Sequence, residues 1–359
     1  MSNSIQPISG NYNTLSELLV VGSMNTNNEL TTLEEQSSSG YVAQTYGGIG
    51  AASSTIFNLN PEINQIGTYQ SNINSATNNM SISQTALSQI ASIAQTFYAD
   101  LPDINDTSSN EIASVAANAK SALSQVASLL DTTNGSDYIF SGQDGSNPPI
   151  ANPDAITSTG MYTQISSAVS NLSTLGASGV LSAALSAASS DATGTTPFST
   201  YLSQSGQTAP TSVQVGANQW VQTGVLANTN TLATSSGSNT TGSYMRDLLM
   251  SLSVLGSLTS SQASDPGLSD LVTGLQSTMS GAISAMSTEQ GVLGDSQTDL
   301  TTQASNYTDL TTSLTSQVSN VQDVNMASVA TQLQSVQTQL TASYQLIANL
   351  KSLSLTNYL

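Results

Sequence analysis

Apolar side chains in the last part of the chain recur at alternating steps of three and four residues. Two such runs fall between residues 293 and 347. The first contains Leu293, Leu300, Ala304, Tyr307, Leu314, Val318 and Val321, and the second contains Met326, Ala330, Leu333, Leu340, Tyr344 and Ile347. These steps place one narrow apolar stripe along a helix, as in the seam of a coiled coil. We therefore expect a long C-terminal helix that needs a partner along this stripe.

The two runs are separated by a slip in the pattern at residues 323–325. A slip of this kind is a stutter, which divides a coiled-coil helix into two packing segments. No proline follows Pro266, so every later residue keeps the backbone N–H that a helix needs. The sequence therefore predicts one long helix with two packing segments.

The beginning of the chain carries a weaker form of the same stripe. Between residues 12 and 36 its positions are Leu15, Leu19, Gly22, Leu30 and Leu33. Helices in proteins gain most of their stability from packing, so this helix is expected to depend on a partner. The three serines and the glycine at 37–40 are expected to end it. Because each end of the chain carries a single stripe, we expect the two terminal helices to pack together.

The longest regular pattern runs from Ile63 to Ala94, where the alternation of four and three residues continues for more than four heptads. Proline is tolerated in the first turn of a helix, so Asn60 and Pro61 are the expected start. Three seam positions are polar: Gln70, Thr77 and Gln84. Such groups lower stability but fix the register between helices. A shorter helix is expected over residues 109–130.

The middle of the chain has a different pattern. Prolines at 148, 149, 153, 197 and 210 interrupt it, with a helical signal between residues 162 and 190. Two alternating segments, 212–216 and 219–223, flank Gly216-Ala217-Asn218 and predict a β-hairpin. Trp220 lies on this hairpin and is expected in the core of a small domain. Residues 235–243 have the composition of a linker.

These patterns together predict a mainly α fold. We expect an elongated antiparallel coiled-coil stalk of N- and C-terminal helices, with an inserted mixed α/β middle domain. The expected divisions are terminal assembly helices at 1–40 and 322–359, a helical stalk domain at 41–147 and 244–321, and an inserted outer domain at 148–243. The terminal helices are expected to be disordered before assembly.

Composition restricts the chemistry. The chain has 3 basic and 22 acidic residues, no histidine and no cysteine, and its net charge is -19. A shortage of cations argues against binding to nucleic acid or to anionic membranes. Without cysteine or histidine, the chain lacks disulfides, thiolate chemistry, histidine-based triads and the common zinc ligands. No cofactor, metal site or enzymatic activity is expected.

Solubility must rest on neutral polar residues, which crowd every segment. Such surfaces repel each other weakly and suit a protein that packs against copies of itself. The first ten residues lack the pattern of a secretory signal. No window holds 18 consecutive apolar residues, so no membrane span is expected.

Three stretches of the sequence are similar to the flagellin superfamily. Residues 323–333 with 353–359 resemble its C-terminal helix, residues 33–40 resemble its helix leading into an S-S-G turn, and residues 135–142 resemble its G-x-Y-L-F-S-G segment. The final L-S-L-T-N-Y-L is similar to the proteins that join hook to filament, whereas filament flagellins usually finish with a Leu-Leu-Arg-like tail.

The resemblance implies a structural protein of the bacterial flagellum, located outside the cell. Its implied partners are copies of itself in a ring or helical assembly, the neighbouring hook-associated protein, flagellin, and a cytoplasmic export chaperone on the C-terminal helix. Export would pass through the flagellar type III channel without a cleaved signal peptide.

The assembly face expected on this basis comes from both terminal helices. Its residues are Leu15, Leu19, Leu30, Leu33, Met326, Leu333, Leu340, Tyr344, Ile347 and Leu350. Three alternatives to a junction protein stay open: a filament-forming flagellin, a secreted hydrolase or adhesin whose insertion binds glycans, and an unrelated coiled-coil protein.

Overall fold

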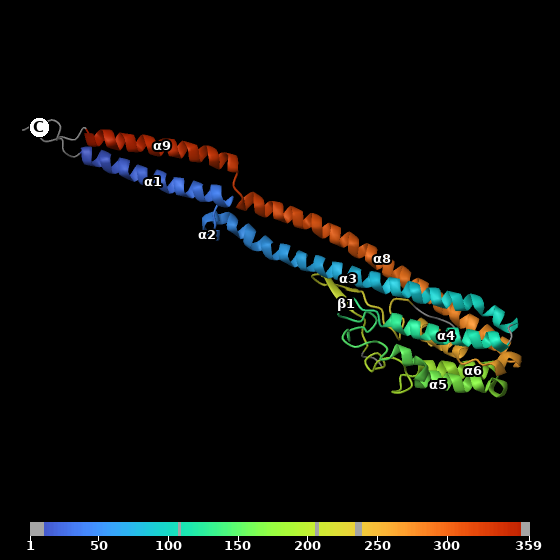
Figure 1. Cartoon of the computed structure of the whole chain (residues 1–359). Helices are drawn as coiled ribbons and strands as arrows, with labels where there is room; N and C mark the ends of the chain where they lie inside the picture. Colours follow the sequence, from blue (N-terminus) through green and yellow to red (C-terminus); the bar gives the residue numbers. More distant parts are fainter. Residues whose placement is uncertain (1–10, 107–108, 205–207, 234–238, 353–359) are drawn as a thin grey trace, which may run out of the picture. The chain divides into compact units, whose positions relative to one another are not determined.

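The computed structural model describes residues 11–106, 109–204, 208–233 and 239–352. Its fold is mainly α, with long helices toward both ends of the chain and a small mixed region in the middle of the sequence (Figure 1). This confirms the fold class that the sequence predicts. The chain forms two compact units, one of residues 1–66 with 308–359 and one of residues 67–307.

The elements follow in chain order. The α-helices are α1 (Asn11–Ser39), α2 (Tyr46–Ile49), α3 (Ser53–Asp100), α4 (Ser109–Leu130), α5 (Gly160–Ser170), α6 (Leu172–Ser189), α7 (Tyr244–Gly256), α8 (Leu268–Gln322) and α9 (Met326–Ser352). Short 3-10 helices are η1 (Gly50–Ala52), η2 (Pro102–Asp106), η3 (Pro153–Ser158) and η4 (Ser260–Ser264). The strands are β1 (Ser212–Gly216) and β2 (Gln219–Gln222).

In the first unit, α1 and α9 pack against each other and run in opposite directions (Figure 1). The pairing of the two terminal helices follows the expectation from their single stripes. Each helix buries one narrow face and leaves the rest in solvent, as a two-stranded pair requires.

The short segments that follow α1 and α8 are joined to each other by backbone hydrogen bonds. Tyr41 forms an antiparallel bridge with Asp323, the Val42 N–H donates to the Gln322 carbonyl (2.8 Å), and the Val324 N–H donates to the Gly40 carbonyl (2.9 Å). Gly40 has a φ of +76°, a conformation that a residue with a Cβ rarely adopts. The two chain breaks therefore form one small hydrogen-bonded joint.

Two expectations about where helices begin and end are wrong. The slip at 323–325 is a complete break between α8 and α9, because these residues bond to the segment after α1 instead of continuing the helix. Pro61 is not at a helix start either, since α3 begins at Ser53 and carries Pro61 inside it. Burial of Ile56, 1% exposed, stabilises the additional turns and offsets the one hydrogen bond that proline removes.

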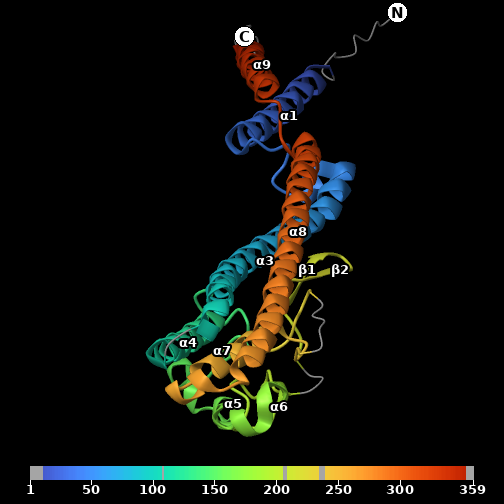
Figure 2. The same ribbon diagram turned by 90° about the vertical axis from the view of Figure 1, so that its right-hand side faces the viewer.

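The second unit is organised around α7. Every residue of α7 is buried, including Arg246 and Asp247. Helices α4, α5 and α6 all contact it, and η3 and η4 contact α4 (Figure 2). A helix covered on all sides explains why its sequence carries apolar residues on more than one face.

One hydrophobic core extends through this unit. It includes Phe140 and Ile150 from the middle region together with side chains of α3, α4, α7 and α8. Residues 148–243 thus share a core with the neighbouring helices, and the boundaries of the compact units fall at 66/67 and 307/308 instead. The functional division of the chain given above stays a prediction.

Within this unit, α3 and α8 are joined by side-chain amides at intervals of one heptad. Gln70 donates from Nε2 to the Ala304 carbonyl (3.4 Å), Gln297 to the Thr77 carbonyl (3.2 Å) and Gln84 to the Gln290 carbonyl (3.3 Å). Each contact is seven residues from the next along both helices. The polar seam positions predicted from the sequence thus lie at the helix contact and set its antiparallel register.

The predicted hairpin is present, with β1 and β2 antiparallel and a register irregularity between Gln214 and Gly216. The expectation for Trp220 is wrong, because its side chain is 63% exposed. Successive strand residues point to opposite faces. The neighbouring Val221 packs against the core, which places Trp220 on the outer face.

One helix among the described residues is long and apolar enough to cross a membrane by length and composition: α6, with a mean hydropathy of 1.3. Gly176 interrupts it with a φ of +65°, and Leu172, Val180 and Ala184 are among its buried residues. Its contacts with α5 and α7 are those of a helix at the edge of a protein core.

Candidate assembly interface

The contact between α1 and α9 is built on three buried side chains. Leu33 on α1 and Val329 and Val336 on α9 are 5%, 4% and 4% exposed. Leu30, Val324 and Leu333 pack around them and are partly buried. A fully buried Leu or Val contributes about 1.5–3 kcal/mol. Three such residues are few for two helices of 29 and 27 residues, so the pair offers surface for further partners.

The structure distributes the predicted interface residues among three environments. Leu33 is buried, and Leu19, Leu30, Leu333, Leu340 and Ile347 are partly buried. Met326 and Tyr344 are 46% and 54% exposed. The side chains of Leu15 and Leu350 lie outside the described residues.

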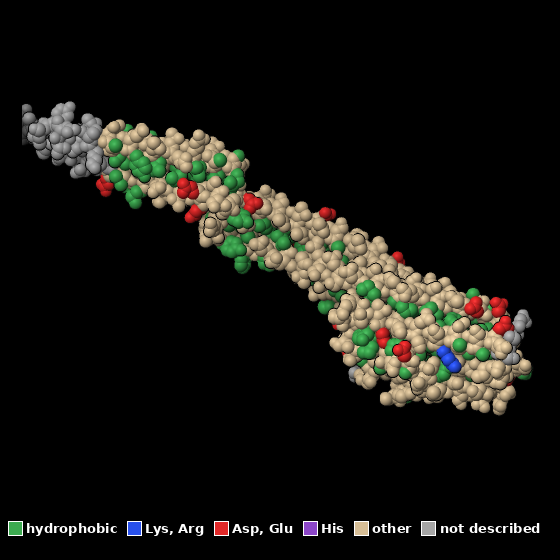
Figure 3. Space-filling model, viewed as in Figure 1, with side chains coloured by type: hydrophobic (Ala, Val, Ile, Leu, Met, Phe, Trp, Pro, Cys, Tyr) green, Lys and Arg blue, Asp and Glu red, His purple; other side chains and the backbone are tan. Residues whose placement is uncertain are grey.

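Exposed apolar side chains extend along the outside of the pair. On α1 they are Leu18, Val20, Val21 and Met24, and on α9 they are Met326, Tyr344 and Leu346. Figure 3 shows hydrophobic side chains over these helices and near the start of α3. Contiguous exposed apolar surface on a protein marks an interaction site or an aggregation liability.

Comparison with known families identifies these segments. A model of the N-terminal helical region of bacterial flagellin matches residues 8–144, and a model of the C-terminal helical region matches residues 277–359. The chain belongs to the flagellin superfamily. A search of the curated proteins finds no match to it.

Membership of this superfamily implies that the chain is a structural component of the flagellum, located outside the cell. It also implies self-assembly into flagellar polymers. The two matched regions contain α1 and α9, the helices that expose apolar surface. The candidate interface therefore lies in the parts of the chain by which the superfamily is recognised.

Val329 and Val336, buried apolar residues of α9, were not identified from the sequence. Together with Leu333, Leu340 and Ile347 they continue an alternation of four and three residues. The polar Ser343 occupies the next position of that series and conceals it. Following Val329 and Val336 at their spacing of seven residues would have found the stripe.

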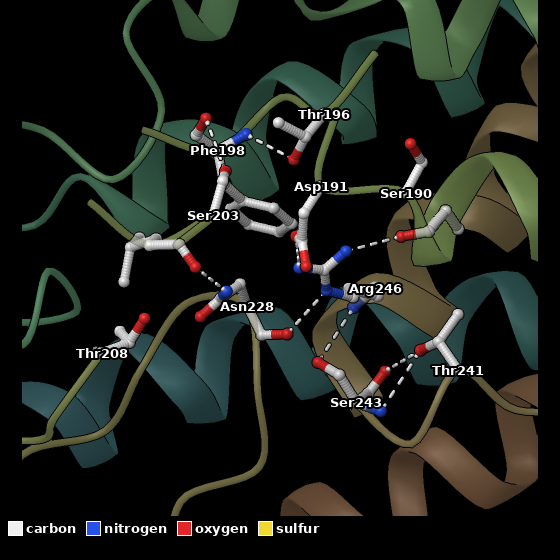
Figure 4. Close-up of polar contacts among 12 residues, drawn as sticks. Ser190, Asp191, Thr196, Phe198, Ser203, Thr208, Asn228, Thr241, Ser243 and Arg246 are labelled. Atoms are coloured by element: carbon white, nitrogen blue, oxygen red, sulfur yellow. Dashed lines mark hydrogen bonds and ion pairs between the residues drawn. The ribbon is translucent and has the colours of Figure 1, made fainter. Parts of the chain in front are cut away.

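In the interior of the second unit, the charged side chain of Arg246 lies among polar partners. Arg246 on α7 donates to the carbonyls of Asn228 (2.8 Å) and Ala188 (2.9 Å), and pairs with Asp191 (2.5 Å; Figure 4). Its guanidinium lies over the Phe198 ring, 5.2 Å from the centroid. Among the described residues this is the one ion pair. Arg246 thus ties α7 to the end of α6 and to the segments that follow α6 and β2.

Two buried carboxylates fasten the segment before α7. Glu289 on α8 accepts from the N–H groups of Leu232 (3.0 Å) and Ala233 (2.6 Å). Asp247 accepts from the Thr241 N–H (2.7 Å). Burial raises the pKa of both carboxyl groups, and these hydrogen bonds lower it in part.

These groups act as structural anchors. Glu289 and Asp247 accept from backbone N–H groups of the segment before α7. Arg246 donates to backbone carbonyls on α6 and after β2 and pairs with the Asp191 side chain. Within the described part of the chain, no group of three His, Cys, Asp or Glu is placed to hold a metal ion.

Proposed function

We propose that this chain is the junction protein that joins the flagellar hook to the filament. The observation that carries the proposal is the ending Leu353–Leu359, which is similar to the junction proteins and unlike the Leu-Leu-Arg-like tail of filament flagellins. Self-assembly, which superfamily membership implies, supports it.

The terminal helices would supply the assembly face. Leu19, Leu30, Leu333, Leu340 and Ile347 are only partly covered within one chain, so copies have apolar surface left to bury. Met326 and Tyr344 are exposed and available to a neighbouring chain. Leu15 and Leu350 belong to the same proposed face on the sequence pattern alone.

The proposed neighbours are a hook-associated protein on one side and flagellin on the other. A cytoplasmic export chaperone would cover the C-terminal helix before assembly, because its apolar residues favour aggregation when exposed. Export without a cleaved signal peptide is part of the same proposal.

A filament-forming flagellin is the second candidate. The matches to the N- and C-terminal helical regions of bacterial flagellin favour it, since those regions are described by the name of the filament protein. Both candidates share the fold and differ in whether growth continues from copy to copy.

Seeded polymerisation separates the two candidates. Purified full-length chain is mixed with sheared hooks or with filament fragments, sedimented and imaged. A junction protein adds a short collar to hook ends and then stops, so uptake saturates at a fixed ratio to hook ends. Long filaments of this chain alone would overturn the junction proposal and establish the flagellin.

A further inference from the structure

The only tryptophan of the chain stands on the surface of the second unit. Trp220 on β2 is 63% exposed, more than any other large apolar residue described between 67 and 307. The others exposed in that range are Tyr98 and Leu175, at 40% and 47%. Tryptophan, with tyrosine and arginine, is enriched among the residues that dominate the binding energy at the centres of protein interfaces.

The hairpin that carries Trp220 is fixed to the helices mainly through β1, and Gln303 of α8 also donates to the Gln219 side chain of β2 (3.2 Å). Tyr307 and Gln303 of α8 donate to the Val215 carbonyl (2.7 and 3.1 Å), and Asn72 of α3 donates to the Gln214 carbonyl (2.9 Å). Figure 2 shows the two strands beside α8. An anchored aromatic loses little conformational freedom on binding, so more of its burial energy stabilises a complex.

No third strand pairs with the other edge of the hairpin in the described part of the chain, although the Gln222 side chain of β2 donates to the Thr231 carbonyl (3.2 Å). The sheet there has two strands, and β2 has β1 as its one neighbour. An edge strand offers unpaired N–H and C=O groups to another chain. Trp220 and the β2 edge thus combine an apolar anchor with backbone hydrogen-bonding groups.

The charge distribution points to the occupant. No charged residue occurs between Asp191 and Arg246, although the whole chain carries a net charge of -19. Copies of so acidic a chain repel each other at charged surfaces, and a neutral hairpin avoids that repulsion. A basic partner would be attracted more strongly to the acidic surfaces of the chain than to this neutral hairpin.

We propose that Trp220 and the outer edge of β2 form a contact for a second copy of this chain in the assembled polymer. The inference rests on the proposed function only in requiring that copies assemble. It adds a contact in the second unit to the face on the terminal helices.

Tryptophan fluorescence tests the contact directly, because excitation at wavelengths that the 12 tyrosines do not absorb yields emission from Trp220 alone. In the dilute monomer its emission is that of a solvated indole and is readily quenched by iodide. After seeded assembly and sedimentation, the emission shifts to shorter wavelength and iodide quenching falls. Sedimentation measures assembly in the same samples, independently of the fluorescence.

Two variants provide the comparison. Trp220→Ser raises the concentration needed for assembly at least about tenfold, the equivalent of roughly 1.4 kcal/mol at one contact. The matched control Leu175→Ser, at another exposed apolar residue of the second unit, leaves that concentration unchanged. Circular dichroism confirms that both variants fold, as expected for exposed positions.

The outcomes separate the contact from the proposed function. Polymers that sediment normally while Trp220 stays fully quenchable would overturn the contact and leave the proposed function intact. Failure of the unaltered chain to assemble on any seed would overturn both. A blue shift with anionic vesicles or with hook fragments in the absence of assembled copies would assign the surface to another partner and overturn the inference.

Discussion

The side-chain amide of Gln84 on α3 donates to the backbone carbonyl of Gln290 on α8, at 3.3 Å. The same contact recurs one heptad away in each helix, between Gln297 and Thr77. Polar seam groups of this kind oppose stability and favour one register over its competitors. Removing these contacts should therefore change both the stability of the helix pair and the selection of its register.

Replacing Gln70, Gln84 and Gln297 by Leu together should raise the thermal midpoint and broaden the unfolding transition. The apolar seam gains burial, while the helices lose the groups that select one alignment. Calorimetry of the full chain measures both effects. Gln125→Leu is the control, because Gln125 is exposed on α4 and bonds within its own helix. A triple variant with a lower midpoint and an unchanged width would contradict the register role.

Arg246→Met should destabilise the second unit by about 2–4 kcal/mol. The methionine keeps the packing over Phe198 but leaves the buried carbonyls of Asn228 and Ala188 without their donor. Arg246→Lys should recover part of the loss, since an ammonium cannot reach all three partners at once. Denaturant unfolding followed by circular dichroism measures the change.

The control for this prediction is Lys120→Met, which removes a positive charge from an exposed position on α4. It should change the free energy of unfolding by no more than about 0.5 kcal/mol. Equal effects of the two substitutions would show that net charge, and not the Arg246 contacts, controls stability.

Asp131 predicts how stability responds to acid. Burial raises the pKa of its carboxyl to about 6 from an ordinary value of 3.8, and the hydrogen bond from the Ile150 N–H lowers it in part. The folded chain therefore binds a proton that the unfolded chain releases between these values. Stability falls as the pH rises from 3.8 to about 6 and is gained as the pH falls through that window. Burial of Asp247 and Glu289 raises their pKa values too and acts in the same direction.

Thermal midpoints measured across this pH window should therefore rise as the pH is lowered. Asp131→Asn keeps an oxygen to accept from Ile150 and should flatten the dependence. The exposed Asp295→Asn removes the same charge and should leave the slope unchanged. Equal slopes in the unaltered chain and in Asp131→Asn would disprove the assignment.

Two glycines of the first unit should respond in opposite directions to alanine. Neither has an atom within 4 Å of an added Cβ, so space does not limit either substitution. Gly22 lies inside α1, where alanine is favoured by about 1 kcal/mol. Gly40 has a φ of +76°, where alanine costs on the order of 1–2 kcal/mol. Hydrogen exchange of α1 amides should slow in Gly22→Ala and accelerate near the joint in Gly40→Ala. The same direction in both variants would remove the special role of Gly40.

Leu340→Asp should block incorporation into polymers while the second unit stays folded. It places a charge on the partly buried face of α9, which the proposed assembly would dehydrate. Gln337→Asp adds the same charge at an exposed position of the same helix and should assemble normally. Motility of cells carrying each variant measures incorporation. Normal motility with Leu340→Asp would rule out this face.

The sequence alone determined the elements whose signal is local and repeated. The heptad spacing of Gln70, Thr77 and Gln84 identified a coiled-coil seam, and the flanking turn residues located the hairpin at 212–223. Such patterns can be read without coordinates because periodicity and turn chemistry belong to neighbouring residues.

The tertiary structure decided what depends on contacts between distant residues. It placed Trp220 outside the core and Val329 and Val336 inside a seam, because burial depends on which face the packing partner covers. It broke the helix at 323–325, since these residues find hydrogen bonds with residues 40–42 nearly three hundred positions away. It extended α3 past Pro61, because Ile56 is buried there. Local propensity is weak compared with burial, and only the folded chain shows which residues are buried.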